Sequence, residues 1–434
     1  MTEATAEVLD ICRDLIRIDT TNTGDTPTSA GERVAAEYVA GRLAEVGVDA
    51  RIYESEPGRA SVVARLAGTD PGRGALVVHG HLDVVPADAS EWSVHPFSAE
   101  IRDGYLWGRG AVDMKDFDAM TLAVVRSWRR TGFVPPRDVV LVFTADEEAG
   151  GELGAHYLVD HHAELFEGCT EAIGEVGGFS YTVSDDLRLY LIEVAQKGID
   201  WVRLHVRGRP GHGSMINDDN AITALCEAVA RLGRHRFPVT VTATVRAFLT
   251  EISDALGIPL DPDDPEAAIA KLGPIAALIG ATIRNTANPT RLAAGYKENV
   301  IPSKATATVD CRTLPGQSEI FQAQLQEIVG PDTTIEYVQR QPGLETSFDG
   351  ALVDAMSAAL RAEDAAARPV PYMLSGGTDA KALSRLGIRC FGFAPLRLPP
   401  DLDFAALFHG IDERVPVEGL EFGVRVLDRF LRSS

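Results

Sequence analysis

Two histidines and an aspartate stand two residues apart at the end of a short apolar run. The run Leu76–Val78 has the character of a buried strand, and side chains on a strand alternate between its faces. His79, His81 and Asp83 therefore project to the same side. Imidazole nitrogen is a good zinc ligand, and a nearby carboxylate can accept the second ring N–H and fix the tautomer. The spacing indicates a metal site, with a structural strand-end histidine as the alternative.

Further groups with metal-binding or acid–base chemistry follow other predicted strands and turns. Asp113 lies in a glycine-rich turn before a predicted helix, and Glu175 follows a short predicted strand. Glu147 and Glu148 follow a buried strand, where one carboxylate could bind metal while the other accepts a proton; a solvated turn is the alternative. His409 precedes the last predicted helix. Ligands gather at the carboxyl ends of strands in open α/β sheets, so we expect these groups to meet.

The elements that must position these groups alternate between helix and strand. The predicted helices of this part are Thr5–Ile18, Glu32–Val46, Ala119–Arg129, Ala155–Phe166, Gly350–Arg361 and Gly419–Leu431. Its predicted strands are Arg51–Glu54, Ser61–Leu66, Ala75–Leu82, Asp138–Thr144, Glu171–Gly174 and Cys390–Ala394. The continuous apolar run in Asp138–Thr144 is typical of a strand buried on both faces. Such alternation predicts an α/β domain with a mostly parallel central sheet.

The pattern changes near Gly198, where strands of alternating apolar and polar residues dominate. The predicted strands here are Asp200–Val206, Val239–Thr244, Ala305–Asp310 and Thr334–Gln339, and the predicted helices are Asn220–Leu232 and Glu319–Val329. This pattern predicts an α+β module with one sheet face open, carrying a Pro-, Asp- and Ala-rich insertion at Leu249–Pro289. We therefore expect a catalytic domain made of residues 1–198 and 342–434, interrupted by an inserted domain at 199–341.

The composition is that of a soluble globular protein and narrows the classes of partner. The 434 residues suffice for two domains, and the formal net charge of −22 disfavours binding to nucleic acid phosphates. No run reaches the ~18 apolar residues of a membrane span, and the N-terminal segment lacks the basic and apolar regions of a signal peptide. Five widely spaced cysteines without a CxxC pair favour a reducing compartment over a disulfide framework, and hence a cytoplasmic protein.

The order of these candidate residues and the residues beside them resemble the motifs of a known family. It is the family of di-zinc amidohydrolases and metallopeptidases that includes aminoacylase, succinyl-diaminopimelate desuccinylase, acetylornithine deacetylase and glutamate carboxypeptidase. The matching motifs cover nearly the whole chain: HGHLDVVP from His79, GRGAVDMK from Gly108, DEE from Asp146, the later Glu175, NVIP from Asn299 with D-x-R from Asp310, GGTD from Gly376, and the late His409. The resemblance implies a zinc-peptidase-like catalytic domain interrupted by an α+β lid or dimerisation domain.

The resemblance also implies a ligand set for two Zn²⁺ ions, with Co²⁺ or Mn²⁺ as alternatives. His81, Asp113 and Glu175 would hold one ion. Asp113, Glu148 and His409 would hold the other, with Asp113 bridging. Imidazoles and carboxylates match the preference of zinc for nitrogen and oxygen ligands.

Other roles are implied for residues beside the ligands. Glu147 would be the general base, Asp83 would orient the first histidine ligand, and the Asp113–Met114 peptide would be cis. His212, in the inserted domain, would stabilise the tetrahedral oxyanion, often across a dimer; a turn histidine is the alternative. His79 faces the right way but is expected to support the site and not to bind metal.

Five residues look like the contacts of that family with a substrate carboxylate: Asn299, Arg312, Gly376, Gly377 and Thr378. Arginine suits bidentate binding of a carboxylate. Without the resemblance, Arg312 would be interpreted as a surface ion pair.

Together these observations predict a metal-dependent hydrolase that cleaves an amide or peptide bond next to a free carboxylate. It would be a carboxypeptidase, a dipeptidase or an N-acyl amino acid hydrolase. The alternatives are a succinyl-diaminopimelate desuccinylase or related deacylase, and an inactive scaffold of the same fold. The expected partner is a small peptide or N-acyl amino acid, with neither nucleic acid nor membrane. We expect a homodimer, with a monomer as the alternative because the insertion could fill the partner's place.

Overall fold

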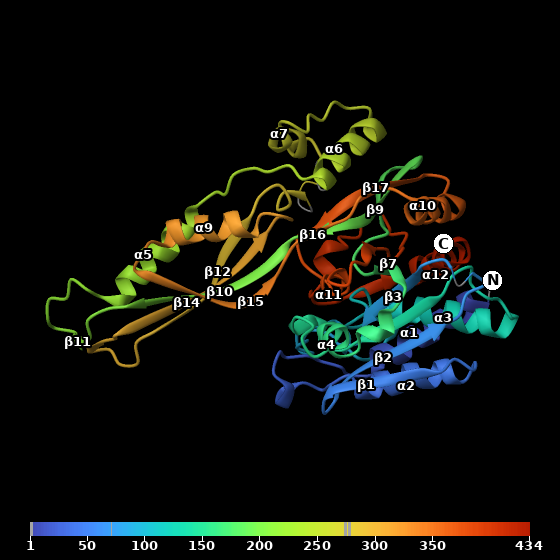
Figure 1. Ribbon diagram of the computed structural model, residues 1–434, viewed down its shortest axis with the longest axis horizontal. Helices are drawn as coiled ribbons and strands as arrows, with labels where there is room; N and C mark the ends of the chain where they lie inside the picture. The colour runs from blue at the N-terminus through green and yellow to red at the C-terminus, as the bar shows by residue number, and fades with distance from the viewer. Residues whose placement is uncertain (1–2, 71, 273–275, 277–278) are drawn as a thin grey trace. The chain divides into compact units, whose positions relative to one another are not determined.

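The computed structural model describes residues 3–70, 72–272, 276 and 279–434, which form two compact units (Figure 1). Unit 1 comprises the residues up to Val194 together with Thr346–Tyr372 and Thr378–Ser434. Unit 2 comprises Ala195–Glu345 and Met373–Gly377. The boundaries expected from the sequence lie four residues from these divisions (198 against 194, and 341 against 345). The short unit 2 segment at 373–377 has no counterpart in the sequence-based division.

A mixed sheet runs through unit 1 in the order β1-β2-β6-β3-β7-β18-β9, and β8 and β17 also pair with β9. Strands β6, β3, β7 and β18 are mutually parallel, whereas β1, β2 and β9 are antiparallel to their neighbours. The bounds are β1 Ala50–Glu56, β2 Arg59–Leu66, β3 Ala75–His81, β6 Val139–Thr144, β7 Cys169–Gly174, β8 Phe179–Ser184, β9 Leu187–Gln196, β17 Ala367–Leu374 and β18 Arg389–Gly392. The parallel centre confirms the predicted fold class.

Helices cover this sheet with apolar faces. In α1, Val8, Ile11, Cys12 and Leu15 recur at helical spacing and are buried, and α1, α3 and α12 pack against one another. The helices of unit 1 are α1 Glu3–Arg17, α2 Arg33–Ala44, α3 Lys115–Thr131, α4 Ala155–His161, α10 Ala351–Glu363, α11 Ala380–Ser384 and α12 Val417–Ser433, and its 3₁₀ turns are η1 Thr26–Thr28, η2 Glu147–Ala149, η3 Ala163–Phe166 and η4 Ala405–Leu407. Strand β6 is buried at all six positions, as the continuous apolar run predicts.

A second, three-stranded sheet of unit 1 joins two parts of the chain that are far apart in sequence. It consists of β4 (Glu100–Arg102), β5 (Tyr105–Trp107) and β19 (Arg414–Pro416), with β5 in the middle. The pair Arg414 and Trp107 lies in register, so the segment before β19 runs beside the glycine-rich turn after β5. This pairing brings the late histidine motif to the turn that carries Asp113.

Unit 2 is built on an antiparallel sheet of order β12-β14-β10-β15. Positions along β10 alternate between buried and half-buried, with Val202 and Leu204 on the buried side beside Phe321. Figure 1 shows α5 and α9 side by side along the sheet, so this face holds the core. The elements are α5 Ala221–Arg234, α6 Ala243–Leu256, α7 Pro265–Ala270, α9 Ser318–Val329, β10 Gly198–Arg207, β11 Gly211–His212, β12 Thr286–Ala294, β13 Val300–Ile301, β14 Lys304–Thr313, β15 Thr333–Gln341 and β16 Leu344–Glu345. The open second face agrees with the predicted α+β module.

Two sequence-based assignments in unit 2 are wrong. No strand forms at Val239–Thr244; instead Thr242 caps α6, its hydroxyl accepting the N–H of Val245. The fourth sheet strand is β12, which includes Pro289; it begins inside the segment assigned to an insertion and continues beyond that segment to Ala294. Pro lacks a backbone donor, and β12 is an edge strand where proline is tolerated. The alternation of apolar and polar residues at 239–244 is short, and the chain starts a helix there because Thr242 provides its N-cap.

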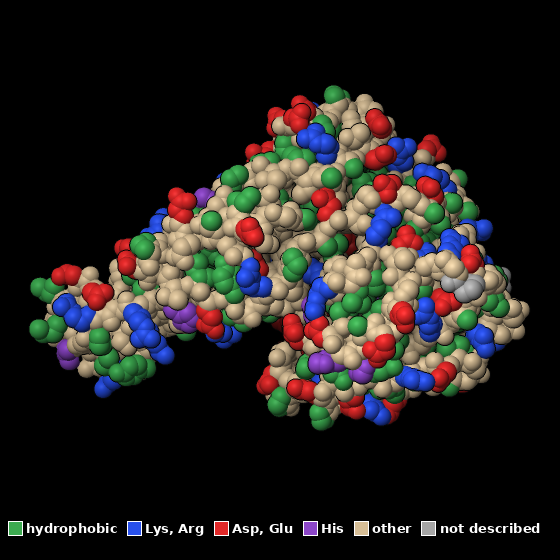
Figure 2. All heavy atoms as spheres, viewed as in Figure 1, with side chains coloured by type: hydrophobic (Ala, Val, Ile, Leu, Met, Phe, Trp, Pro, Cys, Tyr) green, Lys and Arg blue, Asp and Glu red, His purple; other side chains and the backbone are tan. Residues whose placement is uncertain are grey.

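The surface mixes charges of both signs. Figure 2 shows Lys and Arg interspersed with Asp and Glu over the visible face. Among the residues that the structure describes, no helix is both long and apolar enough to span a membrane.

Candidate active site

Neighbouring parallel strands end at one edge of the unit 1 sheet and carry most of the candidate site. Strand β3 ends at His81, which lies opposite Thr144, the last residue of β6. Asp83 follows β3, and Glu175 directly follows β7. Because carboxyl ends of parallel strands share one edge, the sheet explains why residues distant in sequence meet here.

Two groups of three donors form at this edge. The Nε2 atom of His81 lies 3.0 Å from Oδ1 of Asp113 and 3.4 Å from Oε2 of Glu175. The Nε2 atom of His409 lies 3.3 Å from Oδ2 of Asp113 and 3.0 Å from Oε2 of Glu148. Within each group, one donor atom per residue lies within 4.8 Å of the others. Asp113 thus offers one carboxylate oxygen to each group.

Glu413 fixes the turn that presents Asp113. Its carboxylate accepts the backbone N–H of Val112 at 2.8 Å and that of Asp113 at 3.3 Å. Arg109 donates to the second oxygen at 2.7 Å, and both charged side chains are almost fully buried. The peptide between Asp113 and Met114 is cis, as the resemblance implies. Since Glu413 follows His409 by four residues, this contact links the turn to the loop that carries the late histidine.

Asp83 holds the backbone that carries the two adjacent glutamates. Its carboxylate accepts the N–H of Glu147 and that of Glu148, each at 3.1 Å. Towards His81, the closer contact is main-chain: Nδ1 donates to the Asp83 carbonyl at 2.9 Å, while the carboxylate lies at 3.5 Å. Asp83 therefore contacts three of the candidate residues at once, where the sequence suggested only the histidine.

The electrostatics of the site favour positive charge at its centre. Burial raises the pKa of Glu175 to about 8 and also raises that of Glu148. Hydrogen bonds to Asp113 and Glu148 raise the pKa of His409 to about 10. Burial opposes ionisation of Asp113, but its contacts with His409 and His81 outweigh burial and lower its pKa. The carboxylates around the two imidazoles therefore favour a cation at this site.

The donor set fits divalent metal ions of the zinc type. Two imidazole nitrogens and three carboxylates are ligands that zinc accepts. A ligating histidine usually donates its other N–H to a carbonyl or carboxylate, and Nδ1 of His81 does so. Within the described part of the chain, the buried Oε1 atom of Glu148 has no hydrogen-bond partner. This oxygen is therefore available to bind a metal ion.

Glu147 stands beside both groups without belonging to either. Burial, and then the neighbouring Glu175, raise its pKa well above that of an ordinary glutamate. A carboxylate with a raised pKa accepts a proton more readily. The adjacent Glu148 differs in its contacts, because its carboxylate lies 3.0 Å from His409 and belongs to a donor group.

His79 does not join the donors. It is buried on β3, and its ring fills the space beside Gly174, where an added Cβ would lie 2.3 Å from the imidazole. Burial, and then the neighbouring His81, lower its pKa to about 4. A neutral, packed imidazole agrees with the expected supporting role.

The predicted oxyanion residue lies in unit 2. His212 is exposed in β11, and its Nδ1 atom lies 2.8 Å from the Ser214 hydroxyl. Gly213 donates its N–H to the carbonyl of Asn299 at 2.9 Å, so this predicted substrate residue borders the His212 turn. The actions of His212 and Asn299 on the unit 1 donors stay predictions.

The other predicted substrate contacts divide between the units. Gly376 and Gly377 are half-buried in unit 2, whereas Thr378 is buried in unit 1, where its hydroxyl accepts the N–H of Ala380 at 3.2 Å. The Arg312 guanidinium donates to both carboxylate oxygens of a neighbour, at 2.7 and 3.0 Å from Asp310. This is the ion pair that was the alternative interpretation of Arg312, and its contact with substrate stays a prediction.

Three acidic residues of the site escaped the sequence reasoning: Asp146, Asp379 and Glu413. Asp379 accepts the Thr144 hydroxyl at 2.5 Å, and burial raises its pKa to about 7. Asp146 precedes the glutamate pair and adopts a left-handed φ of 68°. Each stands inside or just after a quoted motif, DEE, GGTD or the His409 segment. That position was the available signal, but side-chain direction in a loop cannot be derived from strand alternation.

The parallel centre of the unit 1 sheet, with imidazole and carboxylate donors where its strands end, is the arrangement of a hydrolase of the metallopeptidase type. Residues 77–433 match the family described as peptidase family M20/M25/M40, and the chain belongs to this family.

Relatives of known activity span most of the chain. The N-fatty-acyl-amino acid synthase/hydrolase PM20D1 of Xenopus tropicalis is 27% identical over 456 residues, covering 99% of this chain and 86% of that protein. Aminoacylase-1 of Pongo abelii is 27% identical over 406 residues, covering 92% of this chain and 89% of that protein.

Solved structures share the fold. The M20 family metallo-carboxypeptidase Sso-CP2 of Sulfolobus solfataricus superimposes with a TM-score of 0.74 at 19% identity, covering 98% of this chain and 99% of that one. The di-peptidase Dug1p of Saccharomyces cerevisiae has a TM-score of 0.71 at 17% identity, covering 100% and 99%. These likenesses confirm the expected zinc-peptidase-like fold.

Proposed function

We propose that the protein hydrolyses an amide bond next to a free carboxylate, using two divalent metal ions bound in unit 1. The observation that carries this proposal is the position of Asp113 between the two donor groups. Its Oδ1 atom faces His81 at 3.0 Å, and its Oδ2 atom faces His409 at 3.3 Å. A carboxylate placed in this way suits a ligand shared by two ions.

The proposed ligands are the two donor groups. His81, Asp113 and Glu175 would hold one ion, and Asp113, Glu148 and His409 the other. The bound pair would supply an activated water and polarise the scissile carbonyl. Zinc is the proposed metal, with Co²⁺ or Mn²⁺ as alternatives because they accept the same nitrogen and oxygen ligands.

Proton transfer and the positioning of the reacting groups are assigned to side chains of the protein. Glu147 accepts the proton of the attacking water and passes it to the leaving amine. Asp83 fixes the backbone of Glu147 and Glu148 through two N–H contacts, so both carboxylates keep their directions. The His81 Nδ1–H bond to a carbonyl leaves Nε2 as the nitrogen that can bind metal.

N-acyl amino acids are the proposed substrates. The relatives that cover most of the chain are named aminoacylase-1 and N-fatty-acyl-amino acid synthase/hydrolase. Dipeptides and peptide C-termini are the second candidate, since the neighbours of known structure are titled a carboxypeptidase and a di-peptidase. The substrate carboxylate would meet Asn299, Arg312, Gly376, Gly377 and Thr378. Both substrate classes share the free carboxylate that these residues would recognise.

His212 is proposed to donate to the developing oxyanion, from the partner subunit of a homodimer. The imidazole is exposed in β11 and is therefore accessible to another chain. Co-refolding Glu147→Gln with His212→Ala protein tests the arrangement. Recovery of part of the activity is expected, because each hybrid dimer keeps one intact site. Verified heterodimers without recovery would exclude action across the dimer.

Chelation followed by zinc addition, assayed on matched substrates, tests the proposed function. The panel pairs N-acyl amino acids and dipeptides with the same compounds amidated at the carboxylate. Hydrolysis should disappear on chelation, return with zinc and require the free carboxylate. Absence of metal-dependent hydrolysis across the panel would favour the inactive scaffold. Equal cleavage of the amidated compounds would contradict the proposed recognition.

A further inference from the structure

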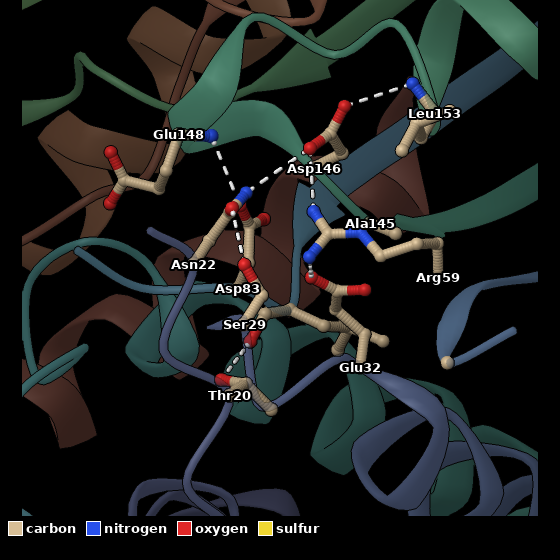
Figure 3. A network of polar contacts seen from close by, with 12 residues as sticks. Thr20, Asn22, Ser29, Glu32, Arg59, Asp83, Ala145, Asp146, Glu148 and Leu153 are labelled. Atoms are coloured by element: carbon tan, nitrogen blue, oxygen red, sulfur yellow. Dashed lines mark hydrogen bonds and ion pairs between the residues drawn. The ribbon is translucent and has the colours of Figure 1, made fainter. Parts of the chain in front are cut away.

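A buried arginine lies behind the loop that carries Glu147 and Glu148. Arg59 is the first residue of β2 and is 2% exposed. Its Nη2 atom donates to Oδ1 of Asp146 at 2.5 Å, and its Nη1 atom lies 3.1 Å from Oε1 of Glu32 (Figure 3). The arginine is separated in sequence from the glutamates by more than eighty residues, so only the fold reveals the contact.

Asp146 links the arginine to the two glutamates. It has a φ of 68°, in the left-handed region that is uncommon for residues other than glycine but is entered by aspartate more often than by most. Its second carboxylate oxygen accepts the N–H of Leu153 at 2.9 Å, and its carbonyl accepts the N–H of Gly151 at 2.7 Å. The contacts at Asp146 therefore fix the turn whose next two residues are Glu147 and Glu148.

A second branch of the network reaches the same loop through Asn22. Its amide donates to Asp146 at 3.2 Å and to Asp83 at 2.9 Å (Figure 3). Asp83 in turn accepts the N–H groups of both glutamates. Two buried aspartates thus hold the loop. Asp146 accepts the N–H groups of Leu153 and Gly151 within the turn, and Asp83 accepts the N–H groups of the two glutamates.

The charges around Arg59 direct its contact to Asp146. Burial, and then the nearby Asp83, raise the pKa of Glu32 to about 8, whereas Arg59 lowers it. The Arg59 guanidinium lies against the Asp146 carboxylate, which also accepts the N–H of Leu153. Removing the arginine would leave this buried carboxylate without its cationic partner, and breaking a buried pair by removing one partner is strongly destabilising.

We infer that Arg59 is a positioning residue for the proposed reaction, acting through Asp146 to direct Glu147 and Glu148. This inference rests on the proposed function for its catalytic consequence. Its structural part concerns only the loop at residues 145–153 and can be measured without substrate.

Three variants and one matched control test the inference. Arg59→Met removes the charge at similar length, Arg59→Gln is a polar replacement if the methionine variant is insoluble, and Arg59→Lys restores the charge without the planar fork. Arg65→Met is the control, because Arg65 lies on the same strand and pairs with Asp138 at the surface. Hydrogen exchange of residues 145–153, bound zinc and the separate values of kcat and KM are measured.

Arg59→Met or Arg59→Gln is expected to accelerate amide exchange in residues 145–153 of the metal-free protein. It should also lower zinc retention and reduce kcat by the ~10–100-fold typical of losing an outer partner of a metal site, with little change in KM. Arg59→Lys should recover part of each loss, and Arg65→Met should change none of them.

A merely structural role predicts a different outcome. Arg59→Met and Arg59→Gln would then lower the unfolding temperature while exchange at 145–153, zinc content and kcat of the folded protein stayed at wild-type values; that result overturns the inference. If the wild-type protein proves inactive on every substrate, the proposed function fails, but faster exchange and weaker zinc binding still support the positioning of the loop by Arg59.

Discussion

Asp146 and Glu336 each contact an arginine, yet only the contact of Asp146 is shielded from water. In unit 1, the side-chain exposure is 2% for Arg59 and 8% for Asp146, and the aspartate accepts two further hydrogen bonds. In unit 2, the side-chain exposure is 42% for Arg203 and 48% for Glu336. Breaking a buried pair leaves an uncompensated charge, whereas an exposed pair contributes ~0.2–1 kcal/mol.

The difference shows how each unit uses its polar residues. The buried contacts of unit 1 lie next to Glu147 and Glu148 and fix the direction of side chains that must meet at one edge of the sheet. The open sheet face of unit 2 carries ion pairs whose loss leaves the apolar core on the other face intact. The ion pair of unit 1 therefore positions a loop of the site, whereas that of unit 2 lies on an exposed sheet face.

The largest effect is expected from Asp113→Asn, because this residue serves both donor groups. Asparagine keeps the size but loses the charge that neutralises two cations. Bound zinc should fall below two ions per chain, and hydrolysis should fall by more than the ~100-fold typical of losing an outer partner. Mass spectrometry of the dialysed protein gives the zinc content, with the exposed Asp88→Asn as control. Full zinc content and normal turnover would disprove a bridging role.

The pH dependence of stability should separate a buried glutamate from an exposed one. Folding raises the pKa of Glu32 from 4.5 to about 8 through burial, so its stabilising proton is fully present below about pH 4.5 and is lost as the pH rises through about 8. Between pH 5 and 8.5, Glu32→Gln should therefore lose less thermal stability than the wild-type protein.

Glu336 provides the control for that measurement. A hydrogen bond from His205 lowers the pKa of this exposed carboxyl, which is the opposite direction. Its contribution is present above the unfolded pKa and is lost only as the pH falls through the folded one. Glu336→Gln should thus follow the wild-type curve between pH 5 and 8.5. Parallel curves for Glu32→Gln and wild type would show that Glu32 is not protonated by burial.

The smallest effect is expected from Arg203→Ala in unit 2. The side chain is exposed, and His205 keeps a 2.6 Å contact with the same glutamate. Chemical denaturation should show a loss below ~1 kcal/mol, with unchanged zinc content and kcat. A loss as large as that of Arg59→Met would remove the contrast between the two units.

The sequence predicted the fold well where burial repeats with a regular period. Strand β6 reads as a continuous apolar run and β10 as an alternating one, and both form. The strand expected at Val239–Thr244 failed because a capping threonine starts a helix there, and β12 was missed because its outward residues are mostly exposed and polar or small. Few residues of such an edge strand are buried, so its sequence shows little alternation of apolar and polar residues.

For the site, the sequence located the donors because each follows a strand or a recognisable motif. The structure brings His81, Asp113, Glu148, Glu175 and His409 into two groups, as expected. The sequence could not identify Arg59, because its contact with Asp146 spans 87 positions and depends on the order of strands in the sheet. Contacts of this kind follow from topology, which a single sequence does not determine.

Zinc content and turnover of Glu147→Gln test the central claim most directly. The claim is that Glu147 moves a proton while Glu148 holds metal, so glutamine at 147 should leave two zinc ions bound and reduce turnover by ~10²–10⁴-fold. Glu152→Gln, at an exposed position of the same loop, is the control. Loss of a zinc ion from Glu147→Gln, with both ions retained in Glu148→Gln, would reverse the two roles. Normal turnover in Glu147→Gln would contradict the account.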